Sequence, residues 1–488
     1  MSEYAPDAVF ARSREAFAQV EEWLAGPEAA GLGHAALEEE LAARGREIQR
    51  RLLQDHLDLR AVRERRRERV TGPDGIARTR AEAGHSRLLS SVFGPVTVSR
   101  IAYRAPGAPN VHPADAELSL PGGRHSHGLG KMTASAVARG SFAQACADVT
   151  RGTGSRLGKR QCQELARQAV TDFGSFYASR RPPAAGPGDV LALSCDGKGI
   201  VVLPGQMRPE TARKARKAVP KQDGRLSRGE VRTRRRIAEA GAVFDITPVP
   251  RTAEDILGPG PHPPGPQAAG KWVTASVAAD AATVVAAVFA EASRRDPGHQ
   301  RTWIALADGN VHQIRRIHAE AAARGITITI ICDVIHVIEH LWDAAWSFFD
   351  QASPDAGPWV RARAAAILDG RAADVAAALR AAATGLTRAR RQAAGKTAGY
   401  LDAKAPYLDY PTALAAGWPI SSGVIEGTCR HLVKDRMDIT GARWGIPTAE
   451  AVLQLRALHA NGDFDAYWAY HLQREHQRNH PARYTLAA

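Results

Sequence analysis

Cysteine is scarce in this chain of 488 residues: five cysteines stand far apart, and none forms a Cys-x-x-Cys pair. This pattern argues against a disulfide framework and against a cysteine-based zinc site, and it favours a reducing compartment. Long apolar runs are also missing, since none approaches the ~20 residues of a membrane-spanning helix. The N-terminus lacks the basic-then-apolar pattern of a secretory signal. We therefore expect a cytoplasmic protein with no membrane partner.

Acidic residues are too few to balance the basic ones. The 51 Asp and Glu face 65 Lys and Arg, which gives a net charge of +14 and a pI near 9.9. Such a balance indicates a polyanionic partner, most often nucleic acid. Residues 208–236 hold twelve Lys and Arg against three acids, a net charge of +9. This tract predicts a flexible arm that lies on phosphates, and a solvated loop is the alternative.

Apolar spacing and a Pro/Gly/Ala linker at 182–187 divide the chain into predicted parts. The part at 81–181 contains a predicted β-hairpin at 91–104, then a helix at 131–150, a Gly-containing turn and a basic second helix that begins near Lys159 and Arg160. That outline is typical of a helix-turn-helix, and an ordinary helical hairpin shares it. The predicted parts are a helical N-terminal region (1–80), a β-hairpin with a helix-turn-helix-like DNA-binding region (81–181), an α/β core (188–340) with a basic insertion (205–240), an all-helical insertion (341–415) and a C-terminal helical part (416–488).

Three aspartates are predicted to follow strands of the α/β core. Apolar runs at 303–307 and 326–331 flank an amphipathic stretch, which predicts a parallel strand–helix–strand unit ending in Asp308 and Asp333. The run 190–194 leads in the same way to Asp196. Strands at 242–249 and 271–279 and a helix at 281–295 complete a ribonuclease-H-like order, in which the first and fourth strands are neighbours. Asp196 and Asp308 are therefore expected to lie close together.

Two neighbouring aspartates stay ionised only beside a cation, and hard oxygen ligands select Mg²⁺ or Mn²⁺. A pair of such ions activates a water or a 3′-hydroxyl for attack on a phosphodiester. The second ion needs a third carboxylate, and Glu426 is the candidate. It stands early in a predicted helix, and the cations Arg430, Lys434 and Arg436 follow it. The alternative role for Glu426 is that of an acid capping the helix.

Four segments carry a resemblance to a known family. They are DGKG around Asp196, ALADGN with HQIRRI around Asp308, CDVIHVIEHLW, and PISSGVIEGTCRHLVKDRM with GARW around Glu426. Over residues 85–460, including the hairpin FGPVTVSRIAYR, the chain resembles bacterial insertion-sequence DDE transposases of the ISKra type, distant relatives of Mutator-like and ISL-type enzymes. The resemblance implies a ribonuclease-H-like catalytic core with an all-α insertion, beside a mainly helical N-terminal DNA-binding region.

The resemblance also implies a bacterial, nucleoid-associated protein, a function and a set of site residues. The function is Mg²⁺-dependent cleavage and strand transfer of double-stranded DNA at terminal inverted repeats and at a target, by a homodimer or larger assembly. The catalytic and metal-binding residues would be Asp196, Asp308 and Glu426. Asp333 and His336 resemble a (C/D)xxH motif that supports the site; Asp333 as the second ligand, and His336 as an ordinary buried histidine, stay open. The predicted DNA-binding residues are Lys159, Arg160, Arg232, Arg234, Arg235, Arg236, Arg430, Lys434 and Arg436.

Other functions fit some of the same residues. His336-Val-Ile-Glu-His340 matches the H-x-x-E-H motif, so a zinc metallopeptidase with Glu426 as third ligand is one alternative. It leaves Asp196 and the basic tract without a role. A non-catalytic DNA-binding regulator derived from a transposase is the other main alternative. A ribonuclease-H-like resolvase or ribonuclease would share the core but lack the helical insertion.

Overall fold

The computed structural model describes residues 9–182, 186, 188–217, 235–439 and 441–481. The chain forms two compact units, one made of residues 1–178 with 462–488 and the other of residues 179–461. The first unit thus combines the two predicted parts 1–80 and 81–181 with the last helix of the predicted part 416–488. The second unit combines the predicted core, the helical insertion and the segment that carries Glu426.

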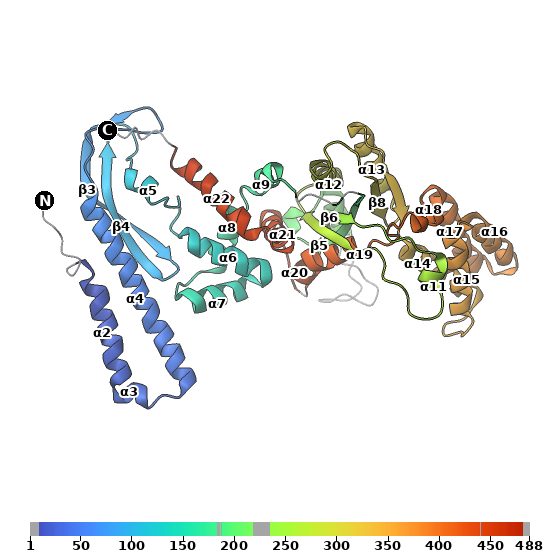
Figure 1. Ribbon diagram of the computed structural model, residues 1–488, viewed down its shortest axis with the longest axis horizontal. Helices are drawn as coiled ribbons and strands as arrows, with labels where there is room; N and C mark the ends of the chain where they lie inside the picture. Colours follow the sequence, from blue (N-terminus) through green and yellow to red (C-terminus); the bar gives the residue numbers. More distant parts are fainter. Residues whose placement is uncertain (1–8, 183–185, 187, 218–234, 440, 482–488) are drawn as a thin grey trace. The chain divides into compact units, whose positions relative to one another are not determined.

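The N-terminal half of the first unit packs helices against a long β-hairpin (Figure 1). Region 1–80 is helical only as far as Arg63, because two short strands follow the charge run at 60–69. The predicted hairpin at 91–104 is longer than expected, since its first strand already begins at Arg80. The elements are α2 (Ala11–Ala25), α3 (Pro27–Ala30), α4 (His34–Arg63), β1 (Val70–Thr71), β2 (Ala77–Arg78), β3 (Arg80–Ser91), β4 (Gly94–Arg104) and α5 (Pro113–Glu117).

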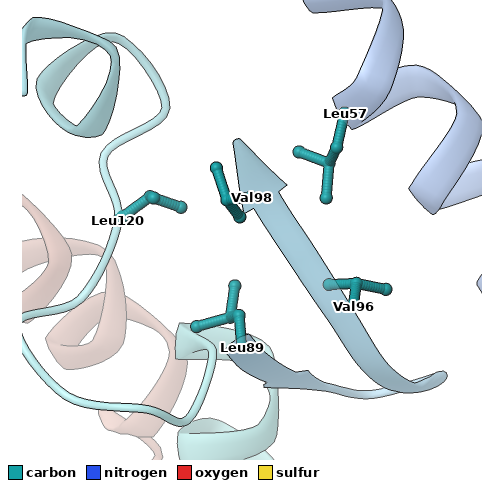
Figure 2. Packing of buried hydrophobic residues seen from close by; sticks show 5 residues of the cluster. All are labelled: Leu57, Leu89, Val96, Val98 and Leu120. Carbon is teal, nitrogen blue, oxygen red and sulfur yellow. The ribbon is translucent and has the colours of Figure 1, made fainter. Parts of the chain in front are cut away.

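A small apolar core joins α4 to this hairpin, as Figure 2 shows. Leu57 comes from α4, Leu89 from β3, and Leu120 from the loop after α5. Val96 and Val98 of β4 point to the same face because side chains alternate along a strand with a period of two. These side chains are almost fully buried, so each supplies about 1.5–3 kcal/mol of hydrophobic stabilisation.

The second half of the first unit is helical. The predicted helix at 131–150 is interrupted at Gly140, where the Ser141 hydroxyl caps a new helix by accepting a hydrogen bond from the Gln144 N–H (3.1 Å). Residues 154–158 then separate two helices, the second of which begins at Lys159. The elements are α6 (His127–Arg139), α7 (Phe142–Thr153), α8 (Lys159–Gln168), α9 (Phe173–Ser179) and α22 (Phe464–Asn479).

A mixed five-stranded sheet forms the centre of the second unit, so the α/β class is confirmed. The strand order is β7-β6-β5-β8-β9; β5, β6 and β7 form an antiparallel meander, and β5, β8 and β9 run parallel. The strands are β5 (Val190–Val201), β6 (Arg235–Ile246), β7 (Ala268–Ser276), β8 (Trp303–Ala307) and β9 (Thr329–Cys332). Four of the five strands begin or end away from the predicted limits, and only β8 has the predicted bounds.

Helices pack against the strands of this sheet. Helix α12 (Ala281–Arg295) crosses β5 and β6, α21 (Ile446–Ala460) packs on β7, and α13 (Val311–Arg324) connects β8 to β9. Gly241 of β6 permits the close approach of α12, because a Cβ there would lie 2.4 Å from Cγ2 of Val288. Two shorter helices in this region are α10 (Pro209–Lys217) and α11 (Ala253–Leu257), and a single 3₁₀ turn is η1 (Pro204–Gln206).

Residues 341–415 contain only helices, 3₁₀ turns and loops. The first of these helices starts at Val334, directly after β9, and is rich in aromatic residues. No helix in the described ranges has the length and apolar character needed to cross a bilayer. The elements are α14 (Val334–Phe348), α15 (Ala356–Leu368), α16 (Ala372–Ala382), η2 (Ala383–Gly385), α17 (Arg388–Lys404), η3 (Ala405–Tyr407) and α18 (Tyr410–Ala415), followed by α19 (Gly423–Thr428), the π-helical η4 (Cys429–Lys434) and α20 (Asp435–Met437).

Candidate functional site

Three aspartates line one edge of the parallel part of the sheet. The pairing of β5 with β8 ends at Ser194 and Leu306, and the pairing of β8 with β9 ends at Ala307 and Cys332. Asp308 and Asp333 directly follow their strands, as predicted. Asp196 does not end its strand, because β5 continues to Val201 along β6 alone. It still lies just beyond the last pair with β8, which places all three aspartates at the same edge.

Asp196 and Asp308 line one cavity of about 500 Å³ between the sheet, α12 and α13. Both side chains are partly exposed. Asp196 accepts a hydrogen bond from its neighbour's N–H through Oδ1 (2.6 Å) and from the Cys429 thiol through Oδ2 (3.4 Å). From the described part of the chain, Asp308 accepts one hydrogen bond, through Oδ1 from the Asn310 N–H (2.8 Å). Both carboxylates therefore keep lone pairs for a further ligand.

Glu239 of β6 is a third acid in this cavity, and the sequence analysis did not find it. Burial raises the pKa of its carboxyl group, and the positive charge of Arg316, which also lines the cavity, acts in the opposite direction. Glu239 pairs across the strands with Gly197, next to Asp196. The only sequence signal was its distance of a few residues from the predicted strand at 242–249, which does not show the direction of its side chain.

Asp333 has a different environment, because the residue is 1% exposed and both oxygens of its carboxylate already accept hydrogen bonds. Oδ1 accepts a hydrogen bond from the Ile335 N–H (2.7 Å) and so caps α14. Oδ2 accepts from the N–H of Ser422 (2.7 Å) and from its hydroxyl. The N–H of Val334 also donates to the Ile420 carbonyl (2.9 Å). Asp333 thus holds the segment before α19 against the start of α14.

Asp333, His336 and Glu426 form a group that could hold a metal ion, since one potential ligand atom of each lies within 4.8 Å of the others. Nδ1 of His336 lies 3.7 Å from Oδ2 of Asp333 and has no hydrogen-bond partner among the described residues. Glu426 is exposed in the first turn of α19. In the described ranges this is the one such group. The predicted ligands Asp196 and Asp308 are not in it, so the oxygens of the predicted triad do not converge to this distance.

Helix α19 and the π-helix after it connect the group to the cavity. Glu426 and Cys429 are three residues apart, so they lie on the same side of the helix. Glu426 belongs to the group with Asp333, whereas the Cys429 thiol donates to Asp196. A π-helical turn often marks a functional site, and η4 begins at Cys429 itself. Cys429 was not predicted, because a lone cysteine has no spacing that indicates its partner.

The predicted cations around Glu426 fall into two classes. Arg430 and Lys434 are exposed and available to a phosphate. Arg436 is buried over the ring of Trp444, 4.8 Å from its centroid, and burial lowers the pKa of its guanidinium to about 10. This burial argues against a contact between Arg436 and DNA, because the charge of Arg436 faces the interior of the protein.

The other predicted DNA-binding residues that the structure describes lie on two elements, α8 and β6. Lys159 and Arg160 are exposed in the first turn of α8. Arg235 forms an ion pair with Asp438 (3.4 Å), and Arg236 donates to the carbonyl of Val277 (2.8 Å). These two side chains are thus partly engaged within the protein. Arg232 and Arg234 lie outside the described residues.

The two histidines of the metallopeptidase alternative do not share a site. His340 is absent from the group formed by His336, and its ring packs on Tyr400 with 3.9 Å between the centroids. Burial lowers the pKa of His340. The chain matches no known protein-family model and no curated protein sequence. The fold and site thus define an α/β protein with a carboxylate-rich sheet edge and a group that could hold a metal ion.

Proposed function

We propose that the chain is a DNA transposase with a ribonuclease-H-like core, which cleaves DNA and joins the free 3′ end to a target in the presence of Mg²⁺ or Mn²⁺. One observation carries the proposal. Asp196 lies on β5, Asp308 directly follows the adjacent parallel strand β8, and both line one cavity, while Glu426 approaches the same sheet edge from a helix far along the chain.

The strand order supports this assignment. An antiparallel three-stranded meander followed by two parallel strands, in the order 3-2-1-4-5, is the arrangement expected for a ribonuclease-H-like core. The helices α15–α18 stand between β9 and the Glu426 helix, where the resemblance places an all-α insertion. Asp196, Asp308 and Glu426 then hold the positions of a DDE triad.

The donor set fits a hard divalent ion. Carboxylate oxygens predominate, and Mg²⁺ and Mn²⁺ prefer such ligands, whereas a zinc site of this kind would need more imidazole or thiolate. When bound, the metal ions would activate the attacking oxygen and stabilise the leaving oxygen of the phosphodiester. Asp196 and Asp308 keep free lone pairs for this role. Asp333 has few left, so we assign it to positioning Glu426 through Ser422.

Positive side chains beside the acids support a nucleic acid as substrate. Arg430 and Lys434 follow Glu426 by one and two helical turns and are exposed. Arg316 lines the cavity that contains Asp196. A phosphodiester needs such neighbours, because its charge must be balanced next to several carboxylates. The chain's net charge of +14 adds a long-range attraction for DNA.

A non-catalytic DNA-binding regulator remains the second candidate. The observation in its favour is that Glu426 groups with Asp333 and His336, while Asp196 and Asp308 lie outside that group. A chain that had lost catalysis would retain the basic residues without needing the three acids to converge. The two candidates differ in one respect, since only the transposase needs carboxylates for its activity.

Cleavage of labelled DNA duplexes that carry the ends of the element tests the proposal. Asp196→Asn, Asp308→Asn and Glu426→Gln should each reduce the cleavage rate by about 10³-fold or more, equivalent to ~4 kcal/mol, because each removes a metal ligand. Binding to the same duplex, measured by a gel-shift assay, should persist. A chelator should stop cleavage by the unchanged protein.

Glu339→Gln is the matched control, since Glu339 is an exposed acid of α14. It should cleave DNA at the original rate. In a metallopeptidase of the H-x-x-E-H type, Glu339 would be the general base, so this variant would abolish a zinc-dependent peptidase activity instead. Undiminished cleavage by the three acid variants would refute the transposase, and binding without cleavage by the unchanged protein would favour the regulator.

A further inference from the structure

Two of the five cysteines meet in the first unit. Cys146 of α7 and Cys162 of α8 lie with their sulfur atoms 3.2 Å apart. Cys162 is 0% exposed, whereas Cys146 is partly exposed. The other three cysteines lie in the second unit and are buried. In the described ranges, no other two cysteines share a hydrogen bond of this kind.

The surrounding helices fix this pair. Helices α7 and α8 pack on each other and both pack on α6. Gly154 ends α7 with a φ of 71°, which favours glycine, and so allows the chain to turn sharply towards α8. The N–H of Gly158 donates to the side chain of Gln161 (2.8 Å), which defines the start of α8. The short distance between the sulfur atoms therefore follows from the packing of two capped helices.

We propose that Cys146 and Cys162 are a modification site, at which a peroxide converts the two thiols into a reversible disulfide. The Cys146 thiol first releases its proton, and the thiolate attacks one peroxide oxygen. The O–O bond breaks, the sulfur becomes a sulfenic acid, and the departing hydroxide takes up the released proton to form water. The sulfur of Cys162 then attacks the sulfenic sulfur, an S–S bond forms, and the S–O bond breaks. The thiol proton leaves with the hydroxide as a second water, and two electrons have passed from the thiols to the peroxide.

The exposure of the two residues sets the order of these steps. Cys146 meets the oxidant first, because Cys162 has no exposed surface. Burial raises the pKa of Cys162 to about 12, with a further contribution from Cys146, so little thiolate is present there at neutral pH. Cys162 consequently acts as the resolving residue and not as the first site of attack.

The bond would fix α8 to α7 across the turn at 154–158. Lys159 and Arg160 at the start of α8 would then be held in one orientation relative to α7. The disulfide does not depend on the proposed function, because it follows from the sulfur contact alone. Its failure would leave the assignment of the three acids unchanged, and the loss of that assignment would leave the disulfide unchanged.

The test uses the full chain in its native state. The reduced protein is treated with hydrogen peroxide, unfolded, alkylated with iodoacetamide, digested and analysed by mass spectrometry. We expect a cross-linked peptide containing Cys146 and Cys162 and alkylation of the other three cysteines. When dithiothreitol is added after the peroxide and before the alkylation, all five cysteines should be alkylated. Alkylation of all five cysteines after peroxide, or a link that joins other cysteines, would overturn the proposal.

Two single variants test the order of attack. With Cys162→Ser, peroxide should leave a sulfenic acid on Cys146 that dimedone labels, because the resolving thiol is missing. With Cys146→Ser, Cys162 should stay unlabelled. Cys332→Ala, which removes a buried cysteine of the second unit, should still give the cross-linked peptide. Dimedone on Cys162 and none on Cys146 would contradict the assigned roles, and the peptide map of the unchanged protein decides the proposal even if a variant does not fold.

Discussion

The strand-to-helix turns after β8 and β9, called the two corners below, have similar local sequences, but their aspartates make different contacts. In each, a buried parallel strand ends in an aspartate and a helix follows. After β9, Asp333 is itself the N-cap of α14, and its oxygens bind Ile335 and Ser422. After β8, the N-cap of α13 is Asn310, two residues beyond Asp308. The extra residues leave Asp308 partly exposed, with a free oxygen on the cavity.

Gly309 makes this difference possible. Its φ of 87° turns the chain in a way that side chains rarely allow, so Asp308 lies before the helix rather than in its cap. The hydroxyl of Tyr400 would lie 2.7 Å from a Cβ at this position. An aspartate that follows a strand is therefore structural when it is itself the N-cap of the next helix, as Asp333 is. It stays available for a ligand when the cap lies further along the chain, as it does after Asp308.

The largest expected effect concerns the available carboxylate. Asp308→Ala should reduce DNA cleavage by about 10³-fold or more, because it removes a metal ligand, and should change the free energy of unfolding by less than about 1 kcal/mol. Urea unfolding followed by tryptophan fluorescence suits the second measurement, since seven of the nine tryptophans lie in residues 179–461. A large loss of stability would mean that the two corners do not differ as described.

Asp333→Ala should have the opposite profile. It removes the N-cap of α14 and leaves the N–H and hydroxyl of Ser422 without their acceptor in a buried place. A lost cap costs about 1 kcal/mol and a buried unsatisfied donor about 1–3 kcal/mol, so we expect a loss of about 3 kcal/mol in the same unfolding experiment. A loss below about 1 kcal/mol would show that Asp333 is not the structural partner.

Gly309→Ala probes the turn that separates the corners. The positive φ alone should cost about 1 kcal/mol, and the approach to Tyr400 should raise the total loss of stability to about 2 kcal/mol. Gly325→Ala is the matched control, because Gly325 also has a positive φ (65°) but nothing lies within 4 Å of its Cβ position. Tyr400→Phe, which removes the hydroxyl, should restore part of the loss in the double variant. Equal losses for the two glycine variants would exclude the contact with Tyr400.

Local signals in the sequence were sufficient for some elements and not for the site as a whole. The strand at 303–307 and the helix at 281–295 have the predicted bounds, since an apolar run and an Asp-capped, Ala-rich segment need no distant partner. Strand β5 was predicted too short because glycines 197 and 199 weaken the strand pattern, and pairing with β6 extends it. The partner of Asp333 stands 89 residues away. A contact over such a separation could not be predicted from local sequence.

Tyr400 contacts residues near both corners, and one of them is His340. The smallest expected effect is the pH dependence of stability that results from the burial of His340. The ring of Tyr400 packs on His340 of α14 from one side, while the Tyr400 hydroxyl lies beside Gly309. Burial lowers the pKa of His340, with opposing contributions from Asp343 and Glu339. The folded protein then binds the His340 proton less tightly than the unfolded chain does. The contribution of His340 to the free energy of unfolding is therefore fully present above the ordinary histidine pKa of about 6.5. It is lost as the pH decreases below that value.

His340→Phe should remove this contribution while keeping the ring contact with Tyr400. The free energy of unfolding of the 179–461 unit, measured in urea at several pH values between 7 and 5, should fall less steeply for the variant than for the unchanged protein. Identical slopes would mean that His340 is protonated as easily in the folded as in the unfolded chain. In that case Tyr400 would not shield the imidazole ring from solvent.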